Sequence, residues 1–429
     1  MKKKKIFIIG LDEFNLEKLK NLPEAKDCEF LPALKFDEIR GVEDYCIPDL
    51  LKKIDKRIEK AGRIDAVVTY FDFPCSVLLP IVVEKYDLYG PCLENIMKCE
   101  HKYWSRQEQH QVIPDNIPGF KAFDPYNKNA YDEIGFTPPF WIKPIKSYHS
   151  YLAYKIKSKS HFYECLKEAQ EYIDYMVEPF TWIISEYDLP KHIKELKETM
   201  FAETEVSGNQ CTVEGYIYEG EVMIYGIIDS VNYDNHPSFA RYQYPSTLPH
   251  EVQYRMSELS RLVIEQIGLN NTPFNIEYFY NKDKNQINLL EINPRMSQSH
   301  ADMFEKIHGI SHHHVMLNLA LGRRPDPMAP EGKYEVASHF MLRHFKPGTV
   351  KKSPTDKEIE YVQNKYPDME LRINVKKDIS LDDLPDYNID SYSYVLANIM
   401  LGAKSHEELM NKYEDVVNNL SFEIDDDDD

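Results

Sequence analysis

The sequence predicts a multidomain α/β fold, and three observations support this prediction. The chain has 429 residues, more than one compact core usually holds, because domains commonly run to about 100–200 residues. Its first part alternates short apolar runs with charged helical stretches, a pattern typical of a parallel sheet. Two β-rich runs within residues 274–295 flank a polar turn and predict an antiparallel hairpin.

The N-terminal region is expected to form a doubly wound, Rossmann-like sheet. The apolar run at residues 6–9 predicts the first strand, residues 50–61 predict a helix, and residues 64–70 predict a second buried strand. Gly10 stands alone after the first strand, so the glycine fingerprint of dinucleotide-binding proteins is absent. The sequence therefore argues against a Rossmann-type dehydrogenase.

The other elements follow in order along the chain. The patterns predict helices at 97–111 and 251–267, strands at 139–144, 200–206 and 210–229, and a long helix over 302–318 after the hairpin. We expect four parts, at residues 1–98, 99–198, 199–325 and 326–429. The last is a small α+β domain that ends in a solvated, disordered acidic tail at residues 425–429.

Composition limits the classes of partner. The formal net charge is −20, so nucleic acid is not an expected partner, because phosphate backbones are bound by basic surfaces. Seven cysteines without metal-clip spacing predict free thiols in a reducing compartment. The chain has no apolar run long enough for a membrane span, and its start lacks the features of a signal peptide. We therefore expect a cytoplasmic protein.

The hairpin carries the most informative polar side chains. Alternation of side chains along a strand gives two expected sets: Asn275, Glu277 and Phe279 on one face of the first strand, and Leu289, Glu291 and Asn293 on one face of the second. If the pairing places Glu277 opposite the second set, two carboxylates and an amide converge, which suits a hard cation such as Mg²⁺. A solvated sheet face with incidental acids is the alternative interpretation. The apolar approach to Glu291 and the polar strand end favour the metal site.

This hairpin resembles the metal-binding strands of the ATP-grasp superfamily. Residues 290–295 read Leu-Glu-Ile-Asn-Pro-Arg, which is similar to the metal strand of that family, and Glu277 falls where its preceding carboxylate stands. The resemblance implies that Glu277, Glu291 and Asn293 hold one or two Mg²⁺ (or Mn²⁺) ions against the phosphates of ATP. It also implies that Arg295 reaches the transferred phosphate or the bound substrate. The resemblance covers roughly residues 1–350.

Two lysines resemble the nucleotide-binding lysines of the family. Lys102 opens the run Lys-Tyr-Trp-Ser-Arg, and Lys143 lies in the run Phe-Trp-Ile-Lys-Pro. A lysine inside an apolar, aromatic strand loses hydration unless an anion pairs with it, and a phosphate is a sufficient partner. The alternative is an edge strand on which Lys143 extends its ammonium group to water.

Two further segments resemble parts of the nucleotide site. Residues 146–151 stand where the family has a glycine-rich phosphate loop, and Ser150 takes the place of the loop serine, although the glycines are missing. Residues 202–215 resemble the hinge strand that presents backbone groups to adenine. The resemblance assigns these positions to the nucleotide: Glu203, Thr204 and Val206 beside the base, and Gln210 in place of a ribose-binding Glu.

The resemblance implies an ADP-forming ligase that couples a carboxylate, activated as an acyl phosphate, to an amine. The overall layout is similar to that of biotin carboxylases. Those enzymes carry Arg-x-Gln-Val-Glu-His at the active-site end, whereas this chain has Ser297 and Ser299 in place of the Gln and the Glu. A serine cannot act as the base that bicarbonate chemistry requires. The expected substrates are a small amino acid or carboxylic acid and an amine, and the layout allows a homodimer.

Other interpretations stay open at this point. One is a biotin-carboxylase-like carboxylase, and another is a catalytically weak ATP-binding regulatory protein, which the glycine-poor loop favours. Residues 230–249 are expected to cover the pocket, with Arg241 as a second substrate or phosphate contact. Ser299, His300 and Arg343 are candidates for the acceptor site, with surface or packing roles as the alternative.

Overall fold

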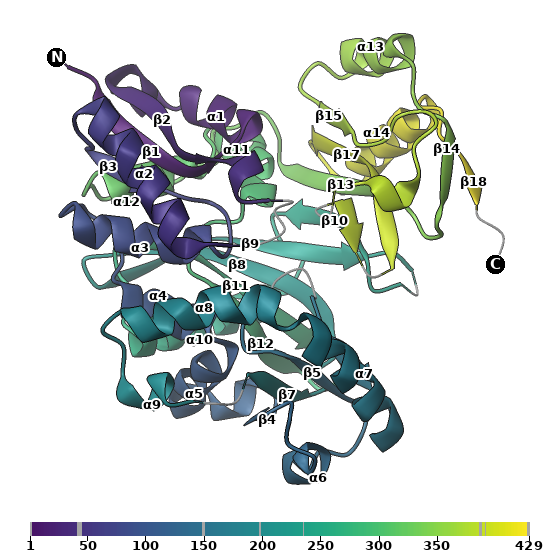
Figure 1. Ribbon diagram of the computed structural model, residues 1–429. Helices are drawn as coiled ribbons and strands as arrows, with labels where there is room; N and C mark the ends of the chain where they lie inside the picture. The colour runs from purple at the N-terminus through teal and green to yellow at the C-terminus, as the bar shows by residue number, and fades with distance from the viewer. Residues whose placement is uncertain are drawn as a thin grey trace.

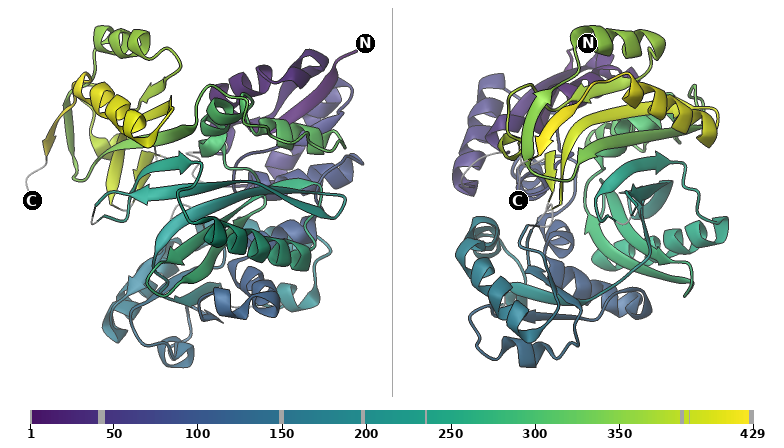
Figure 2. Two further views of the ribbon diagram at one scale, coloured as in Figure 1. Left: turned by 180° about the vertical axis from the view of Figure 1, so that it is seen from behind. Right: turned by 90° about the vertical axis from the view of Figure 1, so that its right-hand side faces the viewer.

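The computed structural model describes residues 2–40, 45–147, 151–196, 199–234, 236–385, 388–390 and 392–426. Figures 1 and 2 show a large central sheet, with a smaller sheet below it and the N-terminal and C-terminal regions above it. The fold is mixed α/β, as the sequence predicted. The four domain boundaries remain predictions.

The N-terminal region is the predicted parallel sheet. Its elements are β1 (Lys4–Leu11), α1 (Glu13–Lys20), β2 (Cys28–Lys35), α2 (Ile47–Ala61), β3 (Ala66–Val68), α3 (Cys75–Lys85) and α4 (Leu93–Glu100). The strand order is β2-β1-β3, and both pairings are parallel. The sequence analysis missed β2, which contains Pro32 and occupies the sheet edge, where a missing N–H is tolerated.

The predicted helix over residues 97–111 is two helices. α4 ends at Glu100, and α5 (Lys102–Val112) begins directly after His101. The Nδ1 atom of His101 accepts a hydrogen bond from the backbone N–H of Trp104 at 3.2 Å and so caps α5. This break places Lys102 at the first position of a new helix.

A smaller sheet, which we call the lid, follows α5. Its elements are β4 (Phe120–Phe123), α6 (Ala130–Ile134), β5 (Phe140–Pro144), β6 (Tyr154–Ile156), α7 (Lys159–Tyr172), α8 (Asp174–Glu186), α9 (Lys191–Lys194) and β7 (Met200–Thr204). The strand order is β4-β7-β5-β6, and buried Phe140, Phe162 and Phe201 lie in its core. Helix α8 leaves the lid: Phe180 packs edge-on against Phe73 of the N-terminal region at 5.7 Å.

The large sheet has the strand order β12-β11-β8-β9-β10-β13-β17-β15, with β16 paired to β17. Its strands are β8 (Asn209–Tyr218), β9 (Glu221–Asn232), β10 (Phe239–Tyr244), β11 (Thr272–Asn281), β12 (Gln286–Asn293), β13 (Val336–His344), β15 (Glu370–Ile373), β16 (Ile389–Asp390) and β17 (Ser393–Ala403). The predicted strand at 210–229 is thus a hairpin, because Gly220 turns the chain at a φ of +83°. The C-terminal strands extend this same sheet.

Helices cover the large sheet, and a short ribbon closes the chain. These elements are α10 (His250–Ile267), α11 (Ala301–His308), α12 (His313–Ala320), α13 (Asp356–Lys365), α14 (His406–Asn418), β14 (Gly348–Lys352) and β18 (Glu423–Asp426). The expected long helix is broken between α11 and α12 at Gly309, whose φ of +74° ends the first helix. The expectation of a disordered tail is wrong for Asp425 and Asp426, which pair with β14.

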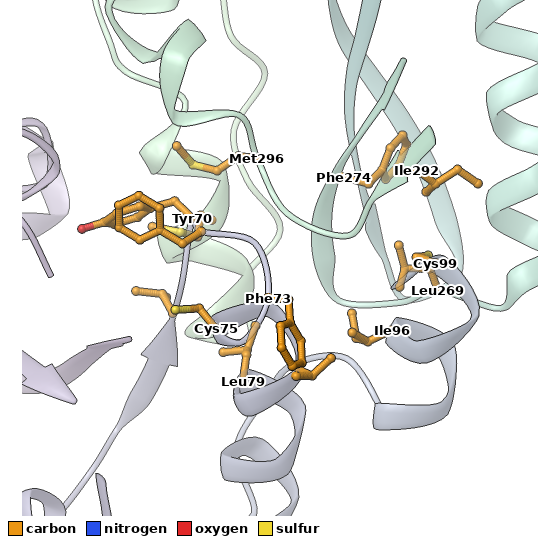
Figure 3. Packing of buried hydrophobic residues seen from close by; sticks show 14 of the residues in the cluster. Tyr70, Phe73, Cys75, Leu79, Ile96, Cys99, Leu269, Phe274, Ile292 and Met296 are labelled. Carbon is orange, nitrogen blue, oxygen red and sulfur yellow. The ribbon is translucent and has the colours of Figure 1, made fainter. Parts of the chain in front are cut away.

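One apolar core joins the N-terminal region to the large sheet. Figure 3 shows Phe73 and Ile96 on one side of this core and Phe274, Ile292 and Met296 on the other. Ile292 lies between Glu291 and Asn293 and is directed into the core, so its two polar neighbours are held on the opposite face of β12. Among the described residues, no helix has the length and apolarity that crossing a membrane requires.

Candidate active site

The register of the β11–β12 hairpin brings the predicted metal ligands together. Glu277 pairs with Glu291, and Asn275 pairs with Asn293, in the antiparallel ladder. Directly opposed residues of two strands lie on one face with their Cβ atoms about 5 Å apart. The pairing that the sequence analysis left conditional is therefore present.

A bulge at Leu290 changes which side chains of β12 share a face. The ladder shifts between Glu277 and Tyr278, so Leu289 pairs with Tyr278, and both side chains are fully buried in the core. The prediction that Leu289 shares a face with Glu291 is wrong, because one extra residue in a strand reverses the alternation.

Glu277 is held by amide groups. Gln210 Nε2 donates to its Oε2 atom at 2.7 Å, and Asn293 Nδ2 lies 3.4 Å from its Oε1 atom. Burial raises the pKa of Glu277 to about 7, and the neighbouring Glu291 carboxylate adds to the rise. A carboxylate in this environment is stabilised by a cation, and the amides do not supply one.

Lys102 forms an ion pair with Glu291, the second carboxylate. Burial lowers the pKa of the Lys102 ammonium group, but Glu291 outweighs that effect and the pKa is raised. The side chain of Glu291 is 37% exposed and that of Lys102 is 11% exposed. The pair therefore opens to solvent on the carboxylate side, where a ligand has access.

Lys143 on β5 reaches a buried carboxylate. Its Nζ atom lies 2.5 Å from Oε2 of Glu203 on β7, and Arg106 Nε lies 2.6 Å from the other oxygen. Burial raises the pKa of Glu203, but Arg106 and Lys143 outweigh burial and hold it at about 2. Burial lowers the pKa of Lys143. Lys143 thus pairs with an anion, and it does not extend to water as the alternative interpretation required.

Arg106, which was not singled out from the sequence, shares the Glu203 carboxylate with Lys143. It also donates through NH2 to the carbonyl of Leu290 at 2.7 Å, on the edge strand β12. Lys102 and Arg106 are four residues apart on α5 and so lie on one face of that helix. Once Lys102 had been assigned to the site, this four-residue spacing could have predicted that Arg106 lies beside it.

A second missed pair lies beside the phosphate-loop segment. Lys146 forms an ion pair with Glu100, and the two residues are 4% and 6% exposed. The Lys146 ammonium group also lies 5.7 Å from the ring centroid of Phe73. The backbone N–H of Lys102 donates to the carbonyl of Ile145 at 2.9 Å, which fixes the start of α5 to the end of β5. Ser150 lies outside the described residues.

Arg295 is held by a carboxylate of the N-terminal region. Its NH2 and Nε atoms lie 2.5 and 2.7 Å from Oδ1 of Asp72, and NH1 donates to the carbonyl of Met296 at 3.2 Å. Burial lowers the pKa of Arg295, but Asp72 outweighs it and the pKa is raised. Asp72 was missed, although it follows the parallel strand β3, and ligands bind beyond the carboxyl ends of such strands.

The predicted hinge residues connect the two sheets. Residues 205–208, which include Val206, link β7 of the lid to β8 of the large sheet. Thr204 Oγ1 accepts from the backbone N–H of Gly119 at 2.9 Å. The side chains of Glu203 and Gln210 are directed to Lys143 and Glu277, respectively.

Arg241 lies apart from this cluster. On β10, Arg241 pairs with Phe340 of β13, and the next residue, Tyr242, pairs with His339. The Arg241 guanidinium lies 6.0 Å from the Phe340 ring, and its Nε atom donates to Gln243 at 3.3 Å. Successive side chains of a strand face opposite ways. Tyr242, and not Arg241, is therefore on the face of the large sheet that carries Glu277.

The three acceptor-site candidates have partners within the fold. His300 Nδ1 lies 2.8 Å from Oε1 of Glu214, and burial lowers the pKa of His300 to about 3, which keeps the ring neutral. The carbonyl of Ser299 lies 3.1 Å from Nδ1 of His339. Arg343 forms an ion pair of 2.8 Å with Asp390.

The donor set for a metal is two carboxylates with an amide. Among the described residues, no group of three or more His, Cys, Asp or Glu side chains is arranged to hold a metal ion. Glu277, Glu291 and Asn293 offer oxygen atoms alone, which suits Mg²⁺ or Mn²⁺ better than a transition metal that prefers nitrogen or sulfur.

Comparisons with known proteins agree with this layout. The ATP-grasp domain family matches residues 136–302. An L-amino acid ligase from Bacillus licheniformis superposes with a TM-score of 0.71 at 16% identity, covering 99% of this chain and 100% of that chain. A carboxyaminoimidazole ribonucleotide synthase from Aspergillus clavatus, complexed with ATP, has a TM-score of 0.68 at 12% identity, with 97% and 98% coverage.

A third structure, a biotin carboxylase from Campylobacter jejuni, has a TM-score of 0.64 at 13% identity, covering 98% of this chain and 92% of that chain. No curated protein sequence matches the chain. Because the identities are low, these structures inform the fold alone. The family match runs from β5 of the lid through the β11–β12 hairpin to the start of α11. Residues 136–302 thus match the ATP-grasp domain family, and the chain as a whole shares its fold with the L-amino acid ligase and the biotin carboxylase.

Proposed function

We propose that this chain is an ATP-dependent, ADP-forming ligase that activates a carboxylate as an acyl phosphate and couples it to an amine. The observation that carries the proposal is the register of Glu277 with Glu291, with Lys102 ion-paired to the second of these carboxylates. An L-amino acid ligase is among the proteins that share the fold. The substrates proposed are a small amino acid or other carboxylic acid and an amine.

Glu277, Glu291 and Asn293 are the residues that would hold Mg²⁺ or Mn²⁺. Burial, with the neighbouring Glu291 carboxylate, raises the pKa of Glu277, and two paired carboxylates with an amide oxygen beside them are a donor set that fits a divalent ion. When bound, the ion would neutralise charge on the β- and γ-phosphates.

Lys102, Lys143 and Arg295 would contact the phosphates of ATP. Each has a carboxylate partner in the structure: Glu291, Glu203 and Asp72, respectively. These acids keep the cations ordered and directed into the site, so that bound phosphate meets positioned charges. Thr204, Val206 and Gln210 are proposed to lie beside the nucleoside, and Ser150 beside the phosphates, on the family resemblance.

The proposed reaction has two steps. A carboxylate oxygen of the acid attacks the γ-phosphorus of ATP, the bond from that phosphorus to the bridging oxygen breaks, and ADP leaves with the bonding electrons. The amine nitrogen then attacks the carbonyl carbon, the carbon–oxygen bond to phosphate breaks, and the nitrogen releases a proton. Arg295, with two nitrogens directed at one oxygen of Asp72, is placed to stabilise the oxygens that gain charge.

The carboxylase alternative is less well supported. Ser297 donates its backbone N–H to Glu214 at 3.2 Å, and Ser299 provides a carbonyl to His339. Both serines thus serve the local structure through their backbone groups. A serine side chain at either position would not supply the base that bicarbonate activation needs.

The test is release of ADP and phosphate from Mg-ATP in the presence of pooled amino acids and carboxylic acids, each with and without an amine pool. Wild type is compared with Glu291→Gln, which removes a metal carboxylate, and with Arg241→Gln, which changes a charge on the other face of the sheet. ADP release that requires an acid and disappears only in Glu291→Gln supports the ligase. Tight Mg-ATP binding without turnover in any pool contradicts it and favours the regulatory alternative.

A further inference from the structure

The face of the large sheet that carries Glu277 extends across β9 to β10, where Tyr242 lies on it. Gln210 on β8 donates to Glu277, and Gln210 pairs in turn with Ser230 of β9. Ser230 pairs with Tyr242 of β10. Paired residues in adjacent strands share a face. Tyr242 therefore projects from the same surface as the proposed metal ligands, two strands beyond Gln210.

Aromatic contacts fix the ring of Tyr242. The ring meets His300 edge-on, with centroids 5.1 Å apart and an interplanar angle of 78°. It meets His339 at 6.0 Å and 71°, and Phe239 lies 5.4 Å away. Edge-to-face contacts at these distances are favourable. His300 is itself held by Glu214, so the direction of the Tyr242 phenol is set by buried neighbours.

The phenol of Tyr242 has no hydrogen-bond partner among the described residues, and the residue is half-buried. The charges that act on it are those of Glu277, Arg343 and Arg295. Burial, with Glu277, raises the pKa of Tyr242 above its usual range, and the two arginines offset part of the rise. The phenol therefore stays protonated at neutral pH and can donate a hydrogen bond.

The hydroxyl groups of two nearby tyrosines already have hydrogen-bond partners within the protein. Tyr244, two residues along the same face of β10, has its hydroxyl 2.8 Å from Nε2 of His308. The hydroxyl of Tyr225 lies 3.3 Å from Glu214 and 3.2 Å from His312. These hydroxyls stabilise the core, and the Tyr242 hydroxyl remains for a ligand.

We propose that Tyr242 is a substrate-contacting residue, whose phenol donates a hydrogen bond to an oxygen of the carboxylate that is being activated and keeps that bond in the acyl phosphate. The inference rests on the proposed ligase function and deepens it, because it assigns the acid to the space between Glu277, Arg295 and Tyr242. Arg295 would contact the same group from the side of the N-terminal region, where Asp72 holds it. The two donors would together orient the acid for attack on ATP.

The first experiment compares Tyr242→Phe with Tyr244→Phe. Each variant keeps a ring on the same face of the same strand and loses one hydroxyl. With the acid that stimulates ADP release, Tyr242→Phe is expected to lower kcat/KM by about 10- to 100-fold, in the range of a lost transition-state donor. Its Kd for Mg-ATP is expected to stay within about twofold of wild type. Tyr244→Phe is expected to keep kcat/KM. Equal losses in both variants, or none in Tyr242→Phe, would overturn the assignment.

A second experiment does not depend on turnover. Tyrosine is labelled with ¹³C at Cζ, and the Tyr242 resonance is identified among the 30 tyrosines as the one missing from Tyr242→Phe. Mg-ADP with inorganic phosphate and acetate serves as the probe. A Tyr242 shift that requires acetate supports the proposal, and a resonance that acetate leaves in place refutes it. If wild type shows no acid-dependent ADP release, the ligase function fails, while this spectrum still decides whether Tyr242 meets a carboxylate.

Discussion

The hairpin β11–β12 and the strand β10 contribute to the same face of one sheet. The sequence pattern placed Glu277 and Glu291 of the hairpin on that face, but it misplaced Arg241 of β10. In β12 the polar residues Glu291 and Asn293 flank Ile292, which is buried, so polarity alternates with the pleat. In β10 the run Arg241 to Tyr244 is polar or aromatic at every position. In β10, therefore, the polarity of the residues does not indicate which of them lie on the face that carries Glu277.

This difference shows that a charged residue in a mixed strand should be assigned by register and not by charge. Arg241 was predicted to contact the substrate or a phosphate because it carries the positive charge of its segment. It pairs with Phe340, on the face of the sheet opposite Glu277. Its neighbour Tyr242 pairs with His339 on the near face.

The largest effect is expected for Glu291→Gln. The substitution keeps the size of the side chain but removes a proposed metal-binding carboxylate and the ion pair with Lys102. We expect acid-dependent ADP release to fall by a factor on the order of 10³ or more, since a lost metal contribution of several kcal/mol corresponds to that range. A coupled ADP assay with saturating Mg-ATP measures it. Turnover within tenfold of wild type would remove Glu291 from the metal site.

A smaller loss is expected for Arg295→Lys. Lysine keeps the positive charge but cannot direct two nitrogens at one carboxylate, as Arg295 does toward Asp72. We expect kcat to fall by roughly 100-fold, with the Kd for Mg-ATP changed far less. Steady-state kinetics and calorimetric titration separate the two quantities. A variant that loses nucleotide affinity and keeps kcat would assign Arg295 to ground-state binding.

A third effect concerns Glu214, which lies on β8, between the hairpin and β10 in the sheet, and makes stability depend on pH. Burial raises the pKa of Glu214 from 4.5 to about 7, so between these values the native state keeps a proton that the unfolded chain has released. The stabilisation is complete below pH 4.5 and is lost as pH rises through about 7.

We therefore expect the Tm of wild type to fall relative to that of Glu214→Gln between about pH 5 and about pH 8, by the equivalent of roughly 1–3 kcal/mol. The glutamine variant keeps a neutral side chain of the same shape and so lacks this titration. Thermal unfolding of both proteins across this range measures the difference. If the Tm values of the two proteins change with pH in parallel, Glu214 is already ionised in the native protein at about pH 5, which would contradict the raised pKa.

The smallest effect is expected for Arg241→Gln. Because the Arg241 side chain lies over Phe340 on the face opposite Glu277, we expect kcat/KM to stay within about twofold of wild type. The same ADP assay applies, with Tm as a check on folding. A tenfold loss of kcat/KM at an unchanged Tm would show that Arg241 acts in the active site.

The fold and the β11–β12 hairpin were predictable because each rests on local pattern. The parallel strands β1 and β3 are short apolar runs, and the hairpin combines β-rich runs, a polar turn and alternating polar side chains. Lys102 and Lys143 were found by resemblance, and the structure brings both to carboxylates near the hairpin.

What could not be predicted depends on tertiary contact. Asp72 meets Arg295 across 223 residues, and Lys146 meets Glu100 across 46, distances at which no sequence period operates. The bulge at Leu290 shifts the alternation of β12, and no glycine or proline at that position indicates it in the sequence. The face of Arg241 is set by the pairing of β10 with β9 and β13, which the segment itself does not encode.

The central claim is that this site transfers the γ-phosphoryl group of ATP to a carboxylate. The most direct measurement uses the stimulating acid with both carboxylate oxygens labelled with ¹⁸O, and determines by mass spectrometry the label in the phosphate released with ADP. Activation through an acyl phosphate predicts one ¹⁸O atom in each phosphate, absent when Glu291→Gln replaces wild type. Unlabelled phosphate released at the rate of ADP would mean hydrolysis by water, and would contradict carboxylate activation at this site.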